Sequence, residues 1–333
     1  MVLKIGTVFI EDPVILAPMS GITDLPFRDL VKSFGAGLVV SEMVASTAVI
    51  EANKRTKKRL EFRKSGSPIS IQLMGRDPGT MAEAAMLCQD LGADIIDINF
   101  GCPAKKVVSG AAGSALMREE PLARKIMHAV VKAVGIPVTI KMRTGWDINK
   151  RNAPELARIA EDIGIQLVTV HGRTRCQFYD GASDWKFIGA IKNAIKIPVI
   201  GNGDITQVED AKTLQQTAHT DGVMIGRGAQ GRPWFLAHVI HFLKTGERLA
   251  RPSSTFQLNI ALRHFDSMLS YYGVKRGIRI ARKHLNWYTA GCYSYDMYKD
   301  QLLKSDDPQQ IRTSLSELFH LELDVPRSNT AFV

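Results

Sequence analysis

One repeated pattern restricts the possible folds of this chain more than any other feature. A short run rich in Val and Ile ends in a polar residue or glycine, and a stretch with helical spacing of apolar residues follows it. The runs are 14–17, 38–41, 69–73, 95–99, 138–142, 167–171, 199–202 and 222–226. Continuous apolar runs are typical of strands buried on both faces of a parallel sheet. Eight such units in series predict an α/β fold, a (β/α)8 TIM barrel, with a doubly wound open sheet as the alternative.

The segments between the runs carry apolar residues three and four positions apart, which is the spacing of an amphipathic helix. We expect helices at 78–91, 119–134, 153–163, 184–195 and 208–217. Glycine or an Ile-Pro pair separates most of these helices from the strand that follows, as expected for chain punctuation.

The pattern changes after residue 243. Residues 244–254 are polar and contain Gly246, Pro252 and two serines, which indicates a linker. No strand-like run follows, and helices are expected at 255–272, 275–289, 295–303 and 308–318. The sequence therefore predicts a catalytic barrel at 1–243, the linker at 244–254 and an all-helical domain, a four-helix bundle, at 255–325.

Composition excludes several classes of protein. The 333 residues are 45% hydrophobic and 23% charged, within the range of ordinary globular proteins. Four cysteines without a Cys-x-x-Cys pair argue against a disulfide scaffold and a zinc site, and no apolar run is long enough to span a membrane. We expect a soluble, cytoplasmic monomer without a metal or a protein partner. The net charge of +10 attracts polyanions but does not identify one.

Polar residues end seven of the eight predicted strands, where the catalytic residues of such barrels lie. A single polar residue at a barrel rim is ordinary, but seven strands that direct polar groups toward one mouth indicate a site. With their apolar and glycine neighbours, the residues singled out at the strand ends are Pro18, Met19, Ser20, Glu42, Gln72, Asn99, Cys102, Lys141, Arg143, His171, Arg173, Asn202, Gly203, Asp204, Gly226 and Arg227.

Two of these strand ends predict a particular ligand chemistry. Glycine-rich turns at 201–204 and 226–228 lead into helices, and such turns allow backbone N–H groups to approach a phosphate. Tight turns without a ligand remain the alternative. Lys141 ends an apolar strand, where an unpaired ammonium is costly. A flavin would suit it because a reduced flavin carries negative charge near N1 and O2, and an ion pair with Glu42 or Asp97 is the alternative.

Cys102 lies in a loop that contains two lysines and is followed by Gly110 and Gly113. A lone cysteine is most often an inert small hydrophobic residue. At a strand-end mouth, however, a thiol with an ordinary pKa of about 8.5 is mostly protonated at neutral pH and can donate a proton. The glycines would allow the loop to close as a lid.

Taken together, these strand ends resemble the tRNA-dihydrouridine synthases, and the B-type bacterial branch most of all. The segments that carry the resemblance are 16–24 (LAPMSGITD), 97–106 (DINFGCPAKK), 141–146 (KMRTGW), 171–175 (HGRTR), 202–205 (NGDI), 226–228 (GRG) and 279–288 (RIARKHLNWY). They occur in the family's order over nearly the whole chain.

The resemblance implies an oxidoreductase that reduces the C5–C6 double bond of uridines in tRNA. NADPH, or alternatively NADH, would reduce FMN, hydride would pass from flavin N5 to uracil C6, and Cys102 would protonate C5. The implied FMN contacts are Pro18, Met19, Ser20, Gln72, Lys141, His171, Asn202, Gly203, Asp204, Gly226 and Arg227. The implied substrate contacts in the barrel are Asn99, Arg143 and Arg173.

The helical segment carries a basic stripe. Lys275, Arg276, Arg279, Arg282 and Lys283 fall within nine residues, and no acidic residue occurs between 267 and 295. A second basic cluster occupies 54–59. A charge run is usually a solvated face, but beside a catalytic mouth it predicts contact with the phosphates of tRNA, from which the target base must be extruded. A flavin barrel that acts on a free pyrimidine, and a non-catalytic tRNA-binding barrel, remain the alternatives.

Overall fold

The computed structural model describes residues 2–51, 60–61 and 68–322. The chain divides into two compact units. The first comprises Met1–Gly228 and Trp234–Glu247, and the second comprises Ala229–Pro233 and Arg248–Val333. Each unit has its own hydrophobic core.

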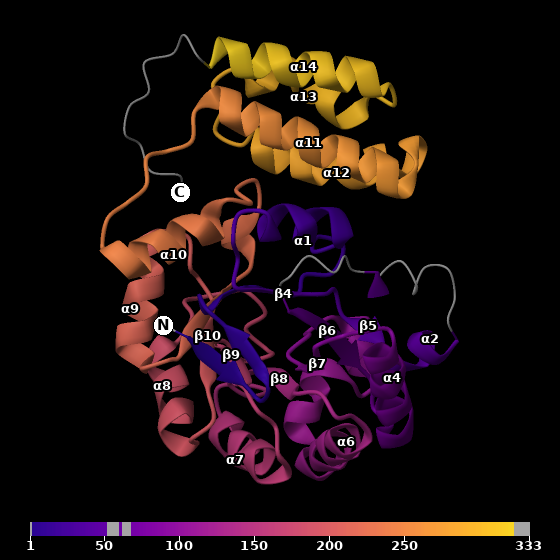
Figure 1. Ribbon diagram of the computed structural model, residues 1–333, viewed down its shortest axis with the longest axis vertical. Coiled ribbons are helices and arrows are strands. Elements are labelled where there is room, and N and C mark those ends of the chain that lie inside the picture. The colour runs from indigo at the N-terminus through magenta and orange to yellow at the C-terminus, as the bar shows by residue number, and fades with distance from the viewer. Residues whose placement is uncertain (1, 52–59, 62–67, 323–333) are drawn as a thin grey trace. The chain divides into compact units, whose positions relative to one another are not determined.

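The first unit contains a closed barrel of eight parallel strands (Figure 1). These are β3 (Val14–Leu16), β4 (Leu38–Val40), β6 (Ile69–Met74), β7 (Ile95–Phe100), β8 (Val138–Arg143), β9 (Val168–His171), β10 (Val199–Asn202) and β11 (Gly222–Ile225). Successive strands pair in parallel, and β11 pairs with β3, which closes the sheet. The predicted TIM barrel is confirmed, each run matching a strand to within one residue, and the closure excludes the doubly wound alternative.

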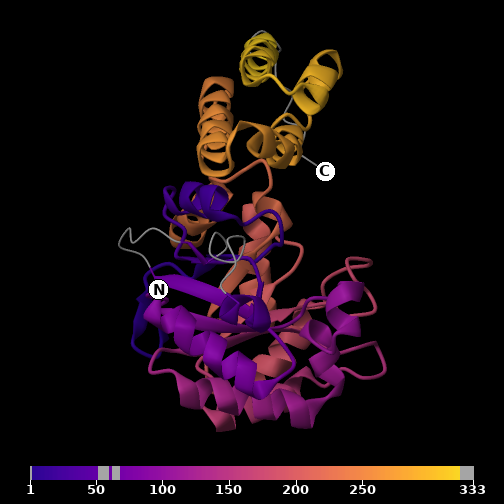
Figure 2. The same ribbon diagram turned by 90° about the vertical axis from the view of Figure 1, so that its right-hand side faces the viewer.

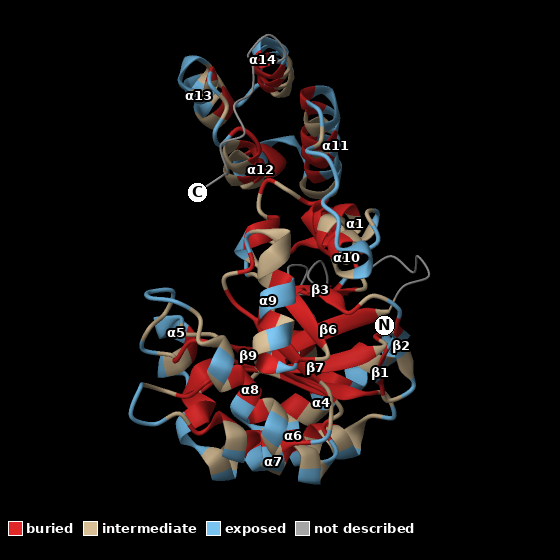
Figure 3. Cartoon of the chain, turned by 90° about the vertical axis from the view of Figure 1, so that its left-hand side faces the viewer, coloured by how far each residue is buried: buried red, intermediate tan, exposed pale blue. Residues whose placement is uncertain are grey.

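Helices alternate with the barrel strands. They are α1 (Leu25–Lys32), α2 (Ser46–Ile50), α4 (Pro78–Asp90), α5 (Lys105–Ser109), α6 (Glu120–Ala133), α7 (Ala153–Ile163), α8 (Trp185–Ala194), α9 (Val208–Ala218) and α10 (Phe235–Thr245), with short 3-10 helices η1 (Gly113–Arg118) and η2 (Arg227–Ala229). Five of them confirm the predicted helices. Figure 3 shows buried strands inside and helices whose outer faces are exposed, the burial expected of a parallel sheet covered by amphipathic helices.

Short elements before and beside the barrel were not predicted. β1 (Leu3–Ile5) and β2 (Val8–Ile10) form an antiparallel hairpin, and β5 (Val44–Ala45) pairs with β6. Leu3, Ile5 and Ile10 share one buried cluster with residues of the barrel strands. Strands of two or three residues are too short to show a periodicity in the sequence. Their packing against the barrel therefore could not be predicted from the sequence.

The described residues of the second unit form four helices, α11 (Ser254–Tyr272), α12 (Val274–Tyr288), α13 (Tyr295–Lys304) and α14 (Pro308–Leu321) (Figure 2). All four confirm helices predicted from the sequence. Gly277 allows close packing, because a Cβ there would lie 2.8 Å from the Met268 carbonyl oxygen on α11. In the part of the chain that the structure describes, no helix is both long and apolar enough to cross a membrane.

Candidate active site

The parallel register brings the predicted polar residues to one end of the barrel. Asn99 on β7 lies opposite Lys141 on β8, and Arg143 lies opposite His171 on β9. His171 in turn lies opposite Asn202 on β10. Since the carboxyl ends of all eight strands meet at one mouth, residues as far apart in the chain as Met19 and Gly226 are neighbours there.

A buried chain of hydrogen bonds runs across three strands toward Cys102. The Thr139 hydroxyl donates to Asp97 Oδ1 over 2.6 Å, and Gln72 Nε2 donates to Asp97 Oδ2 over 2.6 Å. Asn99 Nδ2 donates to Gln72 Oε1 over 2.7 Å. Asn99 Oδ1 then accepts from the backbone N–H of Cys102 over 2.9 Å. We call Thr139, Asp97, Gln72 and Asn99 the polar relay.

The polar relay has one consistent direction. A carboxylate can only accept, so Gln72 must direct its NH2 group toward Asp97 and its oxygen toward Asn99. Asn99 must therefore direct its oxygen toward the loop that carries Cys102. Burial raises the pKa of the Asp97 carboxyl, against hydrogen bonds from Thr139 and Gln72 that lower it.

The backbone of Cys102 is fixed from several sides. Ser114 Oγ on η1 donates to the Cys102 carbonyl oxygen over 2.8 Å, and Arg143 Nε donates to the Gly101 carbonyl over 2.9 Å. Gly113 has a φ of +60°, and a Cβ there would lie 2.9 Å from the Cys102 carbonyl oxygen. Burial raises the pKa of the half-buried Cys102 thiol, which therefore stays protonated at neutral pH.

Lys141 is the cation nearest the polar relay. Its ammonium donates to Asn202 Oδ1 over 3.1 Å, and Asn202 Nδ2 donates to the Met224 carbonyl over 2.8 Å. Burial lowers the pKa of Lys141 to about 8, with a further lowering from Arg143 and an opposing effect of Asp97. Neither Glu42 nor Asp97 makes an ion pair with Lys141 among the described residues; Glu42 instead accepts from the Gly21 N–H over 2.5 Å.

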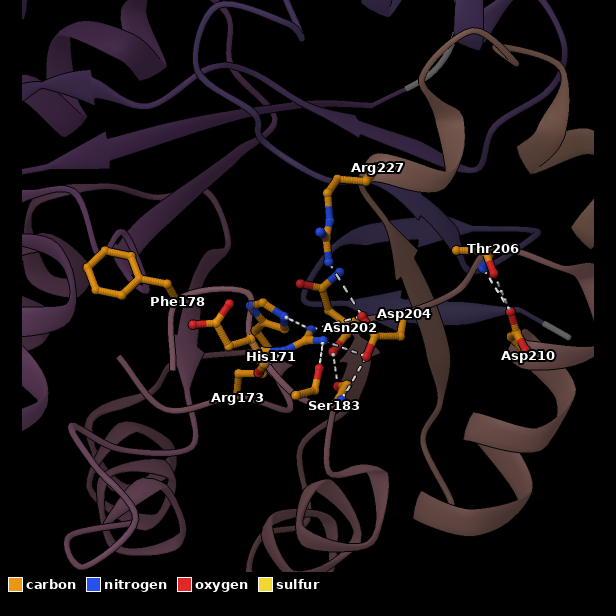
Figure 4. Close-up of polar contacts among 12 residues, drawn as sticks. His171, Arg173, Phe178, Ser183, Asn202, Asp204, Thr206, Asp210 and Arg227 are labelled. Atoms are coloured by element: carbon orange, nitrogen blue, oxygen red, sulfur yellow. Dashed lines mark hydrogen bonds and ion pairs between the residues drawn. The ribbon is translucent and has the colours of Figure 1, made fainter. Parts of the chain in front are cut away.

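Asp204 organises the opposite side of the mouth (Figure 4). Its carboxylate binds Arg173 through two hydrogen bonds of 2.8 Å and accepts from the Ser183 N–H over 2.7 Å. Arg227 Nη2 lies 3.5 Å from Asp204 Oδ1, and its side chain is 54% exposed. Arg227 is therefore available to a ligand, whereas the Arg173 guanidinium is held by the protein.

His171 lies next to this cluster and is neutral. Burial lowers its pKa well below the ordinary value, and the surrounding cations, among them Lys141 and Arg143, lower it further. Arg173 Nη1 lies 3.4 Å from His171 Nε2 (Figure 4). Since a guanidinium only donates, Nε2 is the acceptor and Nδ1 carries the proton.

Glycine turns allow the backbone to approach these groups closely. Gly203 has a φ of +122°, and a Cβ there would lie 2.9 Å from the His171 ring. A Cβ at Gly226 would lie 3.6 Å from Met19 Sδ, which places the end of β11 beside the 18–20 loop. In that loop the Met19 carbonyl accepts from Ile22 and Thr23, while Ser20 is exposed.

Several residues at the mouth were not predicted from the sequence. Thr139 and Ser114 act through the contacts described above, and neither stands out in a sequence of ordinary strand and loop residues. Tyr179 is 54% exposed, with the Arg227 and Arg143 guanidinium carbons 4.8 and 5.8 Å from its ring centre. Because Tyr179 lies in a loop, no periodicity in the sequence marks it. The signal that could have found it is its position eight residues after the strand-end His171.

The five basic residues of the predicted stripe all lie on α12. Lys275, Arg276 and Arg279 are exposed, whereas Arg282 and Lys283 are half-buried. Arg282 Nη2 binds Asp306 Oδ1 over 2.9 Å and also donates to the carbonyls of Lys304 and Ser305. The cluster at 54–59 lies outside the described residues.

Among the residues that the structure describes, no group of three or more His, Cys, Asp or Glu side chains could hold a metal ion.

A family model described as dihydrouridine synthase (Dus) matches residues 15–322, which is most of the chain. The chain belongs to the dihydrouridine synthase family. This confirms the resemblance seen in the strand-end motifs, and with it the prediction that the chain is an enzyme.

Named relatives agree with the family assignment. A probable tRNA-dihydrouridine synthase of Rickettsia conorii is 51% identical over 318 residues, 95% of this chain and 96% of the relative. The tRNA-dihydrouridine synthase B of Xanthomonas axonopodis pv. citri is 50% identical over 286 residues, 86% of each chain. The predicted similarity to the B-type branch is thus confirmed.

Solved structures support the barrel. Morphinone reductase in complex with tetrahydroNAD aligns with a TM-score of 0.53 and 14% sequence identity, over 77% of this chain and 93% of that one. At this identity the likeness concerns the fold alone.

Proposed function

We propose that this dihydrouridine synthase family member is a flavin-dependent enzyme that reduces uridines in tRNA to dihydrouridine. The observation that carries the proposal is the pairing, at one barrel mouth, of a buried cation with a thiol that stays protonated. Lys141 suits an electron-rich ring, and Cys102 holds a proton that it can give away. The names of the relatives support the substrate class.

The residues at the mouth fit a flavin mononucleotide. Lys141 has three N–H donors, and Asn202 Oδ1 is its hydrogen-bond acceptor among the described residues, so two donors remain for a ligand. Gly203 has no side chain, so its backbone can approach His171, and no side chain at Gly226 stands between its backbone and Met19. Half-exposed Arg227 is available to a phosphate. When bound, the flavin would supply hydride chemistry for the C5–C6 double bond of uracil.

Within this proposal, each group of predicted residues has a distinct role. Lys141 stabilises negative charge on the ring system, and neutral His171 offers its Nδ1–H as a donor at the same mouth. Gln72 is held by Asp97 and would contact the flavin ring. The cofactor contacts are Pro18, Met19, Ser20, Gln72, Lys141, His171, Asn202, Gly203, Asp204, Gly226 and Arg227.

The substrate base would be held beside the Cys102 loop. Reduction of a C=C bond needs one hydride and one proton, and the Cys102 thiol delivers the proton to C5. Asn99 orients the loop and contacts the uracil. Arg143 and Arg173 donate most of their N–H groups to protein acceptors. In this proposal they therefore shape the substrate side of the mouth and do not bind the base through free N–H groups.

NADPH is the proposed source of electrons, with NADH as the alternative, and the exposed cations of α12 are proposed to contact the tRNA phosphates. The exposure of Lys275, Arg276 and Arg279 supports this, while Arg282 also links α12 to the loop before α14. Lys283 completes the predicted set.

The decisive experiment follows the flavin spectrum under anaerobic conditions. The purified protein should show flavin bands that bleach with NADPH and return when unmodified tRNA is added. Bands that ignore tRNA but respond to a free pyrimidine would favour a small-molecule enzyme instead. Protein that contains no flavin after reconstitution, yet binds tRNA, would leave a non-catalytic barrel. Cys102→Ala should bleach normally and fail to reoxidise with tRNA.

A further inference from the structure

Two arginines lie against one tryptophan on the rim of the barrel mouth. The Arg118 guanidinium carbon is 3.7 Å from the centre of the Trp146 ring, and that of Arg175 is 4.7 Å from it. Arg175 also lies 4.9 Å from the Phe178 ring centre. These residues come from three consecutive connections, after β7, β8 and β9. We call Arg118, Trp146 and Arg175 the rim stack.

The rim stack is built on a rigid backbone. The connections after β8 and β9 continue side by side: Arg175 N donates to the Gly145 carbonyl and Cys176 N to the Trp146 carbonyl, each over 2.9 Å. Gly145 lets this loop close tightly, because a Cβ there would lie 2.1 Å from the Lys150 carbonyl oxygen. Trp146 and Arg175 are therefore held in place before any ligand arrives.

The guanidinium groups keep their hydrogen-bonding capacity. A cation–π contact uses the face of the guanidinium, so its N–H donors remain directed outward along the edge. Among the residues that the structure describes, neither Arg118 nor Arg175 makes a side-chain hydrogen bond or ion pair, and Arg175 Nε is buried without a partner. Two ordered, uncompensated cations with free edges match the geometry of phosphate oxygens.

The surroundings add positive charge. Lys105 and Lys106 on α5 and Lys150 in the β8–α7 connection are exposed. Glu119, Glu120 and Asp147 carry the opposing charge, three carboxylates against the five cations Lys105, Lys106, Lys150, Arg118 and Arg175, so the sum over these residues is positive. The rim therefore attracts anions.

The rim stack is also close to the proposed proton donor. Ser114, which binds the Cys102 carbonyl, and Arg118 belong to the same 3-10 helix, η1. Four residues of such a helix correspond to about 8 Å along its axis. A phosphate bound by Arg118 would thus be a near neighbour of the nucleotide whose base reaches Cys102.

We propose that the rim stack binds the RNA sugar–phosphate backbone beside the target nucleotide. The proposal rests on the proposed function, because it needs an RNA substrate at this mouth. It adds a contact on the barrel itself that is independent of the basic stripe on α12. An extended polyanion suits the stack because the Arg118 side chain is exposed, and the net charge of +10 favours such a partner.

The test compares Arg118→Ala, Arg175→Ala and the double variant with Arg158→Ala. Arg158 is an exposed arginine on α7, so its replacement removes the same charge away from the rim stack. The affinity for unmodified tRNA is measured at several salt concentrations, and flavin reduction by NADPH is measured without RNA. Each single change should weaken tRNA binding about 5-fold and the double change about 25-fold, with flavin reduction unchanged.

The salt dependence identifies the contact. Each lost phosphate contact should reduce the steepness of the fall of log K with log salt concentration by about 0.7 to 0.9. The slope of the double variant should therefore be less negative by about 1.5. Arg118→Lys with Arg175→Lys should keep most of the slope but regain only part of the affinity, because lysine cannot stack and bind two oxygens at once. A role in folding alone would not produce this pattern.

Three results would overturn the proposal. A double variant with the affinity and slope of Arg158→Ala would show that the rim stack does not touch RNA. An increased KM for NADPH with unchanged tRNA binding would assign the stack to the dinucleotide instead. Wild-type protein that binds no tRNA would refute the proposed function itself, which separates that failure from the first.

Discussion

Replacement of Lys141 by Met tests whether burial at the barrel mouth makes the charge of Lys141 unfavourable in the folded protein. The unfolded chain protonates this lysine at its ordinary pKa of 10.5, whereas burial lowers the pKa to about 8 in the folded protein. The lowering corresponds to about 3 kcal/mol by which the folded state disfavours the charge. At pH 7 the Lys141→Met substitution should remove this cost and so stabilise the folded protein. The gain in stability is reduced by about 1 kcal/mol for the lost hydrogen bond to Asn202, and further by the loss of the cation near Asp97.

The pH dependence gives the sharper result. Since the folded pKa lies below the unfolded one, the unfolded chain binds more protons between pH 8 and 10.5, and wild-type stability rises with pH in that window. Methionine does not titrate, so the variant lacks this contribution. The free energy of unfolding of the wild type, relative to the variant, should therefore increase by about 2 kcal/mol between pH 7 and pH 9.5.

The assay is urea unfolding of flavin-free protein at a series of pH values, with the transition of the barrel followed by tryptophan fluorescence. Titrating groups that do not interact with Lys141 cancel in the difference between the two proteins. Lys132→Met serves as the control, because it removes one lysine from the exposed surface of α6 and leaves the barrel mouth intact. Parallel curves for wild type and Lys141→Met would refute the argument, since they would mean that Lys141 is as well solvated in the folded protein as in the unfolded one.

Three further substitutions test the framework of the site. Thr139→Val leaves the buried Asp97 carboxylate without one donor and should lower stability by about 1 to 3 kcal/mol in urea unfolding, with slower reoxidation by tRNA. Gly113→Ala places a Cβ against the Cys102 carbonyl at a positive φ and should cost about 1 to 3 kcal/mol and slow reoxidation, whereas Gly135→Ala, whose Cβ would meet Gln89 Oε1 at an ordinary contact distance of 3.9 Å, should not. Asp204→Asn should cost about 3 kcal/mol, because buried Arg173 loses its carboxylate, and should weaken FMN retention in equilibrium dialysis. Unchanged stability and activity in each case would argue against the contact concerned.

The barrel could be predicted because its signal is local and repeated. Each strand is buried on both faces, so its apolar run is continuous and visible without knowledge of the partner strand. The polar strand ends were visible for the same reason, since Lys141 and Asn99 interrupt otherwise apolar runs. What could not be predicted is how these ends connect. The direction of the polar relay depends on the register between β6, β7 and β8, which fixes which amide faces Asp97.

The arginines show where residue type alone is ambiguous. Arg173 and Arg227 are both strand-end cations in the sequence, yet one is buried against Asp204 and the other is half-exposed. The basic stripe is similar: no acid occurs near Arg282 in the sequence, but Asp306 is 24 residues further on and binds it. A count of local charges cannot include a carboxylate that only the packing of helices brings close.

The opposite effects of burial on Lys141 and Cys102 lead to a last prediction. Burial raises the pKa of the Cys102 thiol, so its proton stays in place well above neutral pH, whereas burial lowers the pKa of Lys141 to about 8. As pH rises, Lys141 loses its charge first, and loss of that cation raises the pKa of the thiol further. The rate of tRNA-dependent reoxidation should therefore fall with an apparent pKa at or above about 8 that belongs to Lys141.

Single-turnover reoxidation as a function of pH can assign this step. Cys102→Ser removes the thiol and should leave a slow reaction that still loses its rate over the same pH range. Lys141→Arg keeps a positive charge throughout that range and should shift the loss of rate to higher pH or abolish it. If the decline instead disappears in Cys102→Ser and persists in Lys141→Arg, the thiol is the group that titrates, and the proposed order of the two pKa values is wrong.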